Sequence, residues 1–159
     1  RNEPPVARYQ SWDTVTIAEA TDMVNQQAGL EPGTPGTWFQ FAVTLLPNLE
    51  LIGDFGLHVD GSDSRLGEVG FSFASAHQGR GLASEAMLAI LRFSFESLRL
   101  HRVSAVVDRR NDPAVRLLRR SGFRQEGLFI QHSWFKGAWC DEYMFAMLAS
   151  EWRTQTETA

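Results

Sequence analysis

The alternation of apolar and polar positions predicts helices and strands in a regular order along the chain. Thr16 and Glu19 have the spacing of a capping box, and apolar residues follow at helical spacing, so a first helix is expected to about Gln27. Two runs rich in β-branched and aromatic residues follow at 38–45 and 49–57. Because a Pro-Asn turn sequence separates these runs, they predict a β-hairpin.

The middle of the chain predicts a strand, a long helix and another strand. Residues 67–74 alternate small or polar residues with apolar ones, which is the period of a strand. From Leu82 to Leu98 the residues are mostly apolar with one polar stripe, which indicates a long and largely buried helix. Residues 102–108 are rich in valine and predict the next strand.

A short helix and two strands complete the predicted order. Asp112-Pro113 offers an N-cap followed by proline at the first helical position, and Gly122 stands where a left-handed residue would end that helix. Strand periodicity resumes over 123–131, and residues 139–148 are expected to pair with that strand. This order is typical of a single α/β domain with a mixed, mostly antiparallel central sheet of about six strands flanked by helices.

Composition narrows the class of protein. The 159 residues suffice for one domain with a real core, and 43% apolar and 21% charged residues are the proportions of a globular chain rather than a disordered one. No apolar run approaches the roughly 20 residues of a membrane-spanning helix, and no signal-peptide pattern is visible. Since the single cysteine, Cys140, excludes an internal disulfide, a reducing cytoplasm is the expected location.

The charges are distributed unevenly. Residues 1–75 carry three arginines against ten acidic residues, whereas residues 76–159 carry twelve basic residues against nine acidic ones. Eight arginines lie between Arg99 and Arg124, and arginine makes forked contacts to phosphate. An isoelectric point near 5.5 argues against a nucleic-acid partner, so a single small phosphorylated ligand is favoured. The alternative is a solvated helix face.

The segment from His77 to Ala83, which reads HQGRGLA, is the first candidate for that ligand. It lies between a predicted strand and the long helix. Its glycines permit a sharp turn whose N–H groups converge, and the helix that follows directs its positive end to the same place. It is neither a Walker loop nor the three-glycine dinucleotide motif. A glycine-rich turn without any ligand is the alternative.

A second segment, Asn111 to Phe123, makes the first more specific. Asn-x-x-Ala with Gly-Phe about a dozen residues later, directly after a strand, resembles the GNAT family of acyl-CoA-dependent N-acetyltransferases, in which a loop like HQGRGLA holds the CoA pyrophosphate. Leu100-His101-Arg102-Val103 and the tail from Lys136 to Tyr143 resemble the RimJ/RimL-type branch. The resemblance covers roughly residues 38–152.

The resemblance implies a binding site for acetyl-CoA. The family places CoA where the third strand splays from the next, and N–H groups of the third strand, here near Phe73 and Ala74, receive the acetyl carbonyl. The residues implied to hold the pyrophosphate are Gln78, Gly79, Gly81, Leu82 and Ala83, with Asn111 on the pantetheine arm and Arg80 and Arg116 as the choices for the remaining phosphates.

Transfer of acetyl to an amine also needs a base, because an ammonium group must lose a proton before it attacks. Glu68 is the first candidate, and the alternative of equal weight is a solvent-facing strand acid. Asp60 is the second, and His58 could substitute. For the acid, family members have Tyr or Ser where this chain has Leu118 and Ala114.

The group that protonates the departing thiolate is therefore not assigned; the alternatives are Tyr143, Ser121 and water. Cys140 is an unfavoured nucleophile because direct transfer needs no acyl-enzyme. The four histidines show no metal-ligand spacing, so no metal is expected. The aromatic residues are interpreted as core or dimer contacts, with a minority as walls of an acceptor pocket, so a homodimer is one option.

The leading hypothesis is an acetyl-CoA-dependent N-acetyltransferase that acts on a protein N-terminal α-amine or a small amine. A second hypothesis is an acyl-CoA-binding sensor without turnover, because the usual Tyr and Ser are missing. A third is a structural domain without ligand. Val6-Ala7-Arg8-Tyr9 also resembles the RimJ/RimL branch, where an opening strand and helix precede these residues, so we expect both to be missing here.

Overall fold

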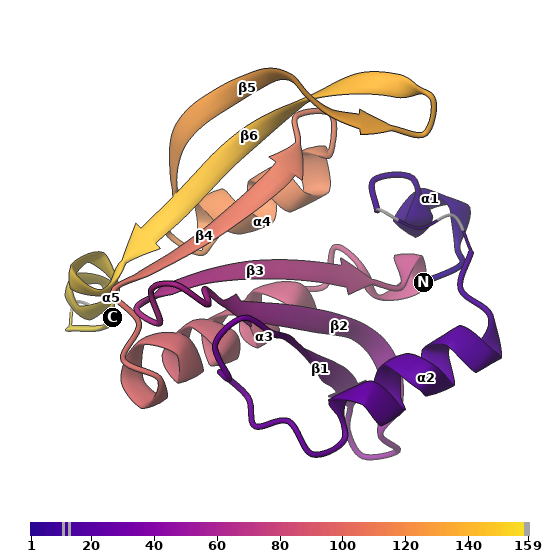
Figure 1. The fold of residues 1–159 in the computed structure, drawn as a ribbon, viewed down its shortest axis with the longest axis horizontal. Coiled ribbons are helices and arrows are strands. Elements are labelled where there is room, and N and C mark those ends of the chain that lie inside the picture. Colours follow the sequence, from indigo (N-terminus) through magenta and orange to yellow (C-terminus); the bar gives the residue numbers. More distant parts are fainter. Residues whose placement is uncertain (11, 13, 158–159) are drawn as a thin grey trace.

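The computed structural model describes residues 1–10, 12 and 14–157, and it places a six-stranded sheet at the centre (Figure 1). The strand order is β1-β2-β3-β4-β6-β5, and every neighbouring pair is antiparallel except β3 and β4. The predicted fold class is therefore confirmed. The strands are β1 (Trp38–Leu45), β2 (Glu50–Val59), β3 (Leu66–Phe73), β4 (Arg102–Asp108), β5 (Arg124–Phe135) and β6 (Ala138–Leu148).

The helices that the sequence predicts are present, together with two α-helices and a short 3₁₀ helix that it does not predict. The helical elements are α1 (Pro4–Ala7), α2 (Ile17–Gln27), the short 3₁₀ helix η1 (Ser75–His77), α3 (Leu82–Arg92) with its π-helical continuation η2 (Phe93–Ser97), α4 (Asp112–Arg120) and α5 (Ala149–Glu157). The capping box of Thr16 and Glu19 is formed. Helices α1 and α5 were not predicted.

The start of α4 differs by one residue from the prediction. Asn111, rather than Asp112, is the N-cap, and its side-chain oxygen accepts a hydrogen bond from the N–H of Ala114 at 3.3 Å. Asp112 and Pro113 then occupy the first two helical positions. Because proline lacks an N–H, either of these positions suits it, and the sequence alone did not separate them.

The two faces of the sheet differ because side chains alternate along each strand. From Gly53 onward in β2, and along β3, β4 and β6, odd-numbered residues face α3 and α4 and form most of the core; these include Phe55, Leu57, Val69, Val103, Ala105 and Phe145, which pack with Met87, Leu91 and Leu118. The register shift between β1 and β2 interrupts this alternation, so Ile52 is buried in the core and Leu51 is exposed. Even-numbered residues lie on the opposite face, which we call the polar face. Helix α2 and the N-terminal residues are attached to that face, where Gln27 bonds to Gln40 and Arg1 to Asp54.

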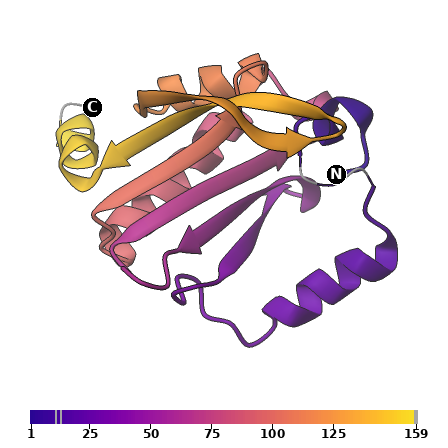
Figure 2. The same ribbon diagram turned by 45° about the horizontal axis from the view of Figure 1, so that its top comes forward.

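The sheet opens between β3 and β4, as Figures 1 and 2 show. Only three residue pairs join these strands, from Leu66–Arg102 to Glu68–Ser104. Beyond them, β3 stays paired with β2 and β4 stays paired with β6, so the halves of the sheet diverge. The splay expected from the family resemblance is therefore present.

Replacing Gly122 with alanine should destabilise the fold by about 1–3 kcal/mol, because Gly122 has φ +91° and a Cβ there would meet Gln155 and come within 3.1 Å of Met147 Cε. Urea unfolding of Gly122→Ala measures this loss. Gly29→Ala is the matched control, since Gly29 has φ +93° but open space around it, and its loss should be smaller. Equal losses for the two variants would contradict the packing argument.

Candidate active site

A cleft of about 670 Å³ occupies the opening between β3 and β4. Its walls come from residues 68–71 of β3, residues 106–108 of β4 and the start of α4. Tyr9 and Gln10 cover it from the N-terminal side, since the Tyr9 hydroxyl donates to Arg110 O and the Gln10 amide donates to Phe71 O. The β5–β6 hairpin contributes His132, Ser133, Trp134, Phe135, Cys140 and Glu142. This size suits a small-molecule site.

The backbone of β3 directs every second N–H group toward the cleft. Ala74 N donates to Ile52 O, and Asp60 N donates to Leu66 O, each at 2.9 Å, so the even-numbered residues of β3 and Ala74 bond to β2. The N–H groups of the odd-numbered residues, Phe71 and Phe73 included, therefore point to the opposite side. The Phe73 N–H has no acceptor within the described residues, and its role as a donor to an acetyl carbonyl stays a prediction. Ala74 does not, because its N–H is already bonded within the sheet.

The segment 77–83, here called the diphosphate loop, presents a row of unpaired N–H groups. Gly79 and Gly81 have φ +73° and +84°, and Gly81 is the N-cap of α3. Gln78 N bonds to Ser75 O and Ser84 N to Gly81 O, but within the described residues the five N–H groups from Gly79 to Ala83 have no acceptor. Convergent N–H groups at a helix N-terminus bind anions.

Arginines lie near the diphosphate loop, but they are not all the ones that the sequence analysis proposed. Arg80 lies in the loop and is exposed, 3.5 Å from His77 Nδ1. Arg116 is exposed on α4. One helical turn later, Arg120 donates to Ser84 Oγ at 3.3 Å and so reaches the first turn of α3. The sequence analysis missed Arg120 as the arginine next to the loop.

Two predicted binding residues have structural bonds of their own. The Gln78 side chain donates to Phe73 O at 2.9 Å and so ties the diphosphate loop to the end of β3. Asn111 lines the cleft, and its oxygen caps α4 while its amide NH₂ makes no bond within the described residues. That NH₂ is the group that can donate to a carbonyl of the pantetheine arm.

Glu68 is the carboxylate best placed for proton transfer. It lines the cleft on the polar face, and its partial burial raises its pKa, while the nearby His58 lowers it and the negative charge of Glu142 raises it. Glu142 lines the same cleft, and its Oε2 lies 2.6 Å from His132 Nδ1. The sequence analysis did not single out Glu142 or His132 as site residues.

The structure places Asp60 and Tyr143 away from the cleft. The Asp60 carboxylate accepts the N–H groups of Ser62 and Asp63 at 2.8 Å and the Ser62 hydroxyl at 2.5 Å, so it holds the β2–β3 turn. These bonds lower the pKa of Asp60, which makes it a poor base. Tyr143 lies on the α3–α4 face, edge-on to Phe145, with 6.2 Å between ring centroids. Neither residue lines the cleft.

Ser121 and Cys140 are the remaining candidates for a chemical role, and only Cys140 lies in the cleft. Ser121 is buried at the end of α4 and is not among the residues that line the cleft. Cys140 does line the cleft, and its Sγ contacts Arg110 Nη2 at 3.1 Å.

In the described part of the chain, no group of three or more His, Cys, Asp or Glu side chains could hold a metal ion. Nor is any described helix both long and apolar enough to cross a membrane.

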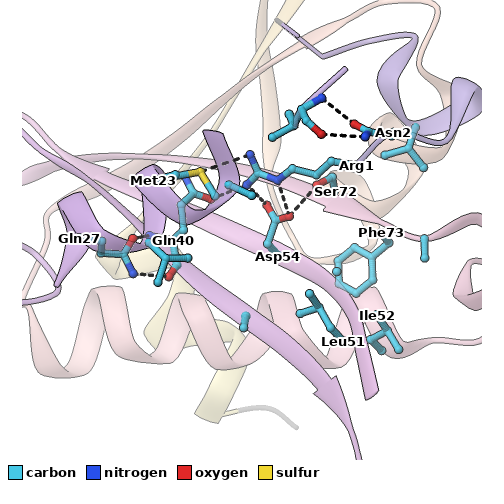
Figure 3. Close-up of a pocket in the computed structure, with 17 residues that line it drawn as sticks. Arg1, Asn2, Met23, Gln27, Gln40, Leu51, Ile52, Asp54, Ser72 and Phe73 are labelled. Atoms are coloured by element: carbon cyan, nitrogen blue, oxygen red, sulfur yellow. Dashed lines mark hydrogen bonds and ion pairs between the residues drawn. The ribbon is translucent and has the colours of Figure 1, made fainter. Parts of the chain in front are cut away.

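A second cavity, of about 510 Å³, lies on the polar face between α2 and strands β1 and β2 (Figure 3). Its charged lining residues, Arg1 and Asp54, pair with each other at 2.8 Å, and Ser72 Oγ donates to the same aspartate. Because both charges are neutralised by each other, this cavity offers no free acid or base. The cleft beside Glu68 is therefore the candidate active site.

Comparison with known proteins agrees with this geometry. The family model described as an acetyltransferase (GNAT) domain matches residues 1–124. The chain belongs to the GNAT acetyltransferase family. An uncharacterized N-acetyltransferase p20 from Bacillus licheniformis is 30% identical over 152 residues, which cover 95% of this chain and 84% of that protein.

Two solved GNAT structures show the same fold. A GNAT-family acetyltransferase from Bacillus anthracis superposes with a TM-score of 0.80 at 28% identity, covering 94% of this chain and 84% of that one. Mycobacterium smegmatis RimJ, solved in complex with CoA-disulfide, gives a TM-score of 0.77 at 25% identity and covers 90% of this chain and 70% of that one. The predicted GNAT resemblance is confirmed, and this GNAT protein is an N-acetyltransferase.

Replacing Gly81 with alanine should weaken the binding of acetyl-CoA about ten-fold, because the left-handed turn that aims the N–H groups is unfavourable for a residue with a Cβ. Isothermal titration calorimetry measures the dissociation constant. Gly29→Ala again serves as the control, because it places the same strain outside the loop and should bind as the wild type does. Wild-type affinity in Gly81→Ala would show that the loop does not hold the ligand.

Proposed function

We propose that this GNAT protein transfers the acetyl group of acetyl-CoA to a primary amine, either the N-terminal α-amine of a protein or a small amine, by direct attack of the amine. The observation that carries the proposal is the row of unpaired N–H groups from Gly79 to Ala83, in a loop that Gln78 ties to the end of β3, the strand whose Glu68 lines the cleft. A candidate anion site and a candidate base thus belong to one strand and the loop that follows it.

The unpaired groups of the chain fit acetyl-CoA. The N–H groups of the diphosphate loop and the guanidinium of Arg120 suit its phosphates, and the Asn111 amide suits the pantetheine arm. When bound, acetyl-CoA supplies a thioester carbonyl. The N–H groups on the open side of β3, at Phe71 and Phe73, are the donors that can polarise that carbonyl.

The two faces of the sheet separate the two substrates. Helices α3 and α4 and the diphosphate loop lie on one side, whereas Glu68 lies on the polar face. We therefore assign the amine to the polar face and CoA to the helical face. The amine binds as an ammonium ion, Glu68 takes one of its protons directly or through water, and the neutral nitrogen attacks the carbonyl.

Water is the proposed proton source for the thiolate. Leu118 is buried in the core, Ala114 has no donor, and Tyr143 is not among the residues that line the cleft. A thiolate whose conjugate acid has a pKa near 8.5 is a stable enough leaving group to take its proton from solvent. The same missing donors support the second candidate, an acyl-CoA-binding domain without turnover.

Replacing Glu68 with glutamine should lower kcat/KM at least about 100-fold near neutral pH, because the base is lost. Thiol release from acetyl-CoA is measured with three probes: a peptide with a free N-terminal alanine, spermidine and a simple alkylamine. In the wild type, kcat/KM should fall as the pH drops through the raised pKa of Glu68, because protonation removes the base.

Three outcomes separate the hypotheses. An unchanged pH profile in Glu68→Gln would remove Glu68 as the base. Binding of acetyl-CoA without thiol release, for any of the three amines, would support the inactive binder instead. Absence of acetyl-CoA binding would contradict both functions.

A further inference from the structure

The β5–β6 hairpin carries a local distortion beside the cleft. The register of the two strands shifts between Phe129 and Ser133, so the hairpin contains a bulge. Gln131, inside the bulge, has φ +48°, a conformation that residues with side chains rarely adopt. Its N–H donates to Asp141 Oδ1 at 2.9 Å, and Asp141 pairs with Arg109 at 3.0 Å. The bulge is therefore held in place from β6.

The bulge brings His132 against Glu142. The His132 Nδ1 and the Glu142 Oε2 are 2.6 Å apart, and the imidazole also packs on Phe129 with 4.8 Å between ring centroids. The side chain of Glu142 is 19% exposed, whereas that of His132 is 54% exposed. Within the described residues, Glu142 Oε1 makes no hydrogen bond, so one oxygen of a fixed carboxylate stays available in the cleft.

Glu142 faces the same space as Glu68. Cross-strand pairs share a face, and the pairs Glu68–Ser104 and Ser104–Ala146 place Glu68 on the face of the even-numbered residues of β6, which include Glu142. Both carboxylates line the cleft. The negative charge of Glu142 adds to burial in raising the pKa of Glu68, as expected for two carboxylates that line one cleft.

Few positively charged side chains lie near Glu68 and Glu142 to offset their negative charges. Among the described residues that line the cleft, the titratable groups besides Glu68 are Tyr9, Asp108, His132, Cys140 and Glu142, and His58 lies beside Glu68 on β2. The Asp108 carboxylate is bonded to Arg110 at 2.5 Å. A mobile cation that enters the cleft is therefore attracted by both glutamates.

We propose that Glu142, held by His132, is a second acidic residue of the acceptor site and binds the ammonium group of the amine beside Glu68. This inference rests on the proposed function. In the reaction, the ammonium R–NH₃⁺ gives one proton to the Glu68 carboxylate and becomes R–NH₂, whose nitrogen lone pair attacks the thioester carbonyl. The C–N bond forms and the C–S bond breaks; the CoA thiolate leaves and takes a proton from water, and the amide nitrogen gives its second proton to the hydroxide so formed. Glu142 takes no part in these proton transfers, so it is a binding residue rather than the base.

The kinetic test is the variant Glu142→Gln with the alkylamine and with spermidine. The KM for the amine should rise about ten-fold, because a charge-assisted hydrogen bond is lost, while kcat and the KM for acetyl-CoA should change less than about three-fold. Glu142→Asp should recover part of the loss. Asp22→Asn, which changes an exposed acid of α2, is the matched control. An unchanged KM for the amine would overturn the inference.

A second measurement needs no turnover, so it separates this inference from the proposed function. The carboxyl carbon of Glu68 is titrated by NMR in the protein without ligands. Glu142→Gln should move the Glu68 midpoint to lower pH, because a negative neighbour is removed. His132→Gln should move it to higher pH, because the Glu142 carboxylate loses the imidazole that bonds to it. Identical midpoints in the wild type and both variants would contradict the proposed arrangement, even in an active enzyme.

Discussion

The parting of β3 from β4 is the constraint on which the rest of the structure depends. A strand with no neighbour leaves backbone N–H and C=O groups without partners, and such groups are unfavourable unless something bonds to them. Three residue pairs join β3 to β4, after which the odd-numbered groups of β3 face an open cleft. Side chains such as Gln10 and Gln78 bond to two of the carbonyls, which leaves the N–H groups of Phe71 and Phe73 for a substrate.

In the proposed function, the alternation of strand residues assigns the two substrates to two sides of the sheet. The apolar face carries α3 and α4, and with them the diphosphate loop and Arg120. The polar face carries Glu68 and Glu142, beside the N-terminal residues that cover the cleft. Because the opening passes between the strands, a carbonyl held from one side can be reached by an amine from the other. The separation of donor and acceptor is thus a property of the sheet, not of any single residue.

Much of this could be predicted from the sequence, and the exceptions have physical causes. The diphosphate loop was found because glycines before a helix indicate an N-terminal anion site. Asn111 was found through the family resemblance. Ala74 was wrong because the hydrogen-bonding side of a strand residue depends on its register with β2, which sequence periodicity does not show. The same limit applies to Tyr143, since a shift of one residue moves a side chain to the other face.

Other residues were missed because their roles arise from contacts distant in sequence. Glu142 joins the cleft through its pairing with β4 and through a bulge that turns His132 toward it. Arg120 reaches Ser84 because of the rotation of α4 against α3, and one turn of helix separates it from Arg116. Helix α5 follows β6 without any turn residue between them, so no sequence signal marks its start. The cytoplasmic location and the possible homodimer of this protein stay predictions.

The central claim is that main-chain N–H groups of residues 79–83 bind the diphosphate of CoA. The most direct measurement is an amide ¹H–¹⁵N NMR titration of the wild-type protein with CoA. The account predicts that the amide resonances from Gly79 to Ala83 shift together as CoA binds, while that of Gly29 does not. Saturable binding of CoA that leaves all five of those resonances unchanged would contradict it.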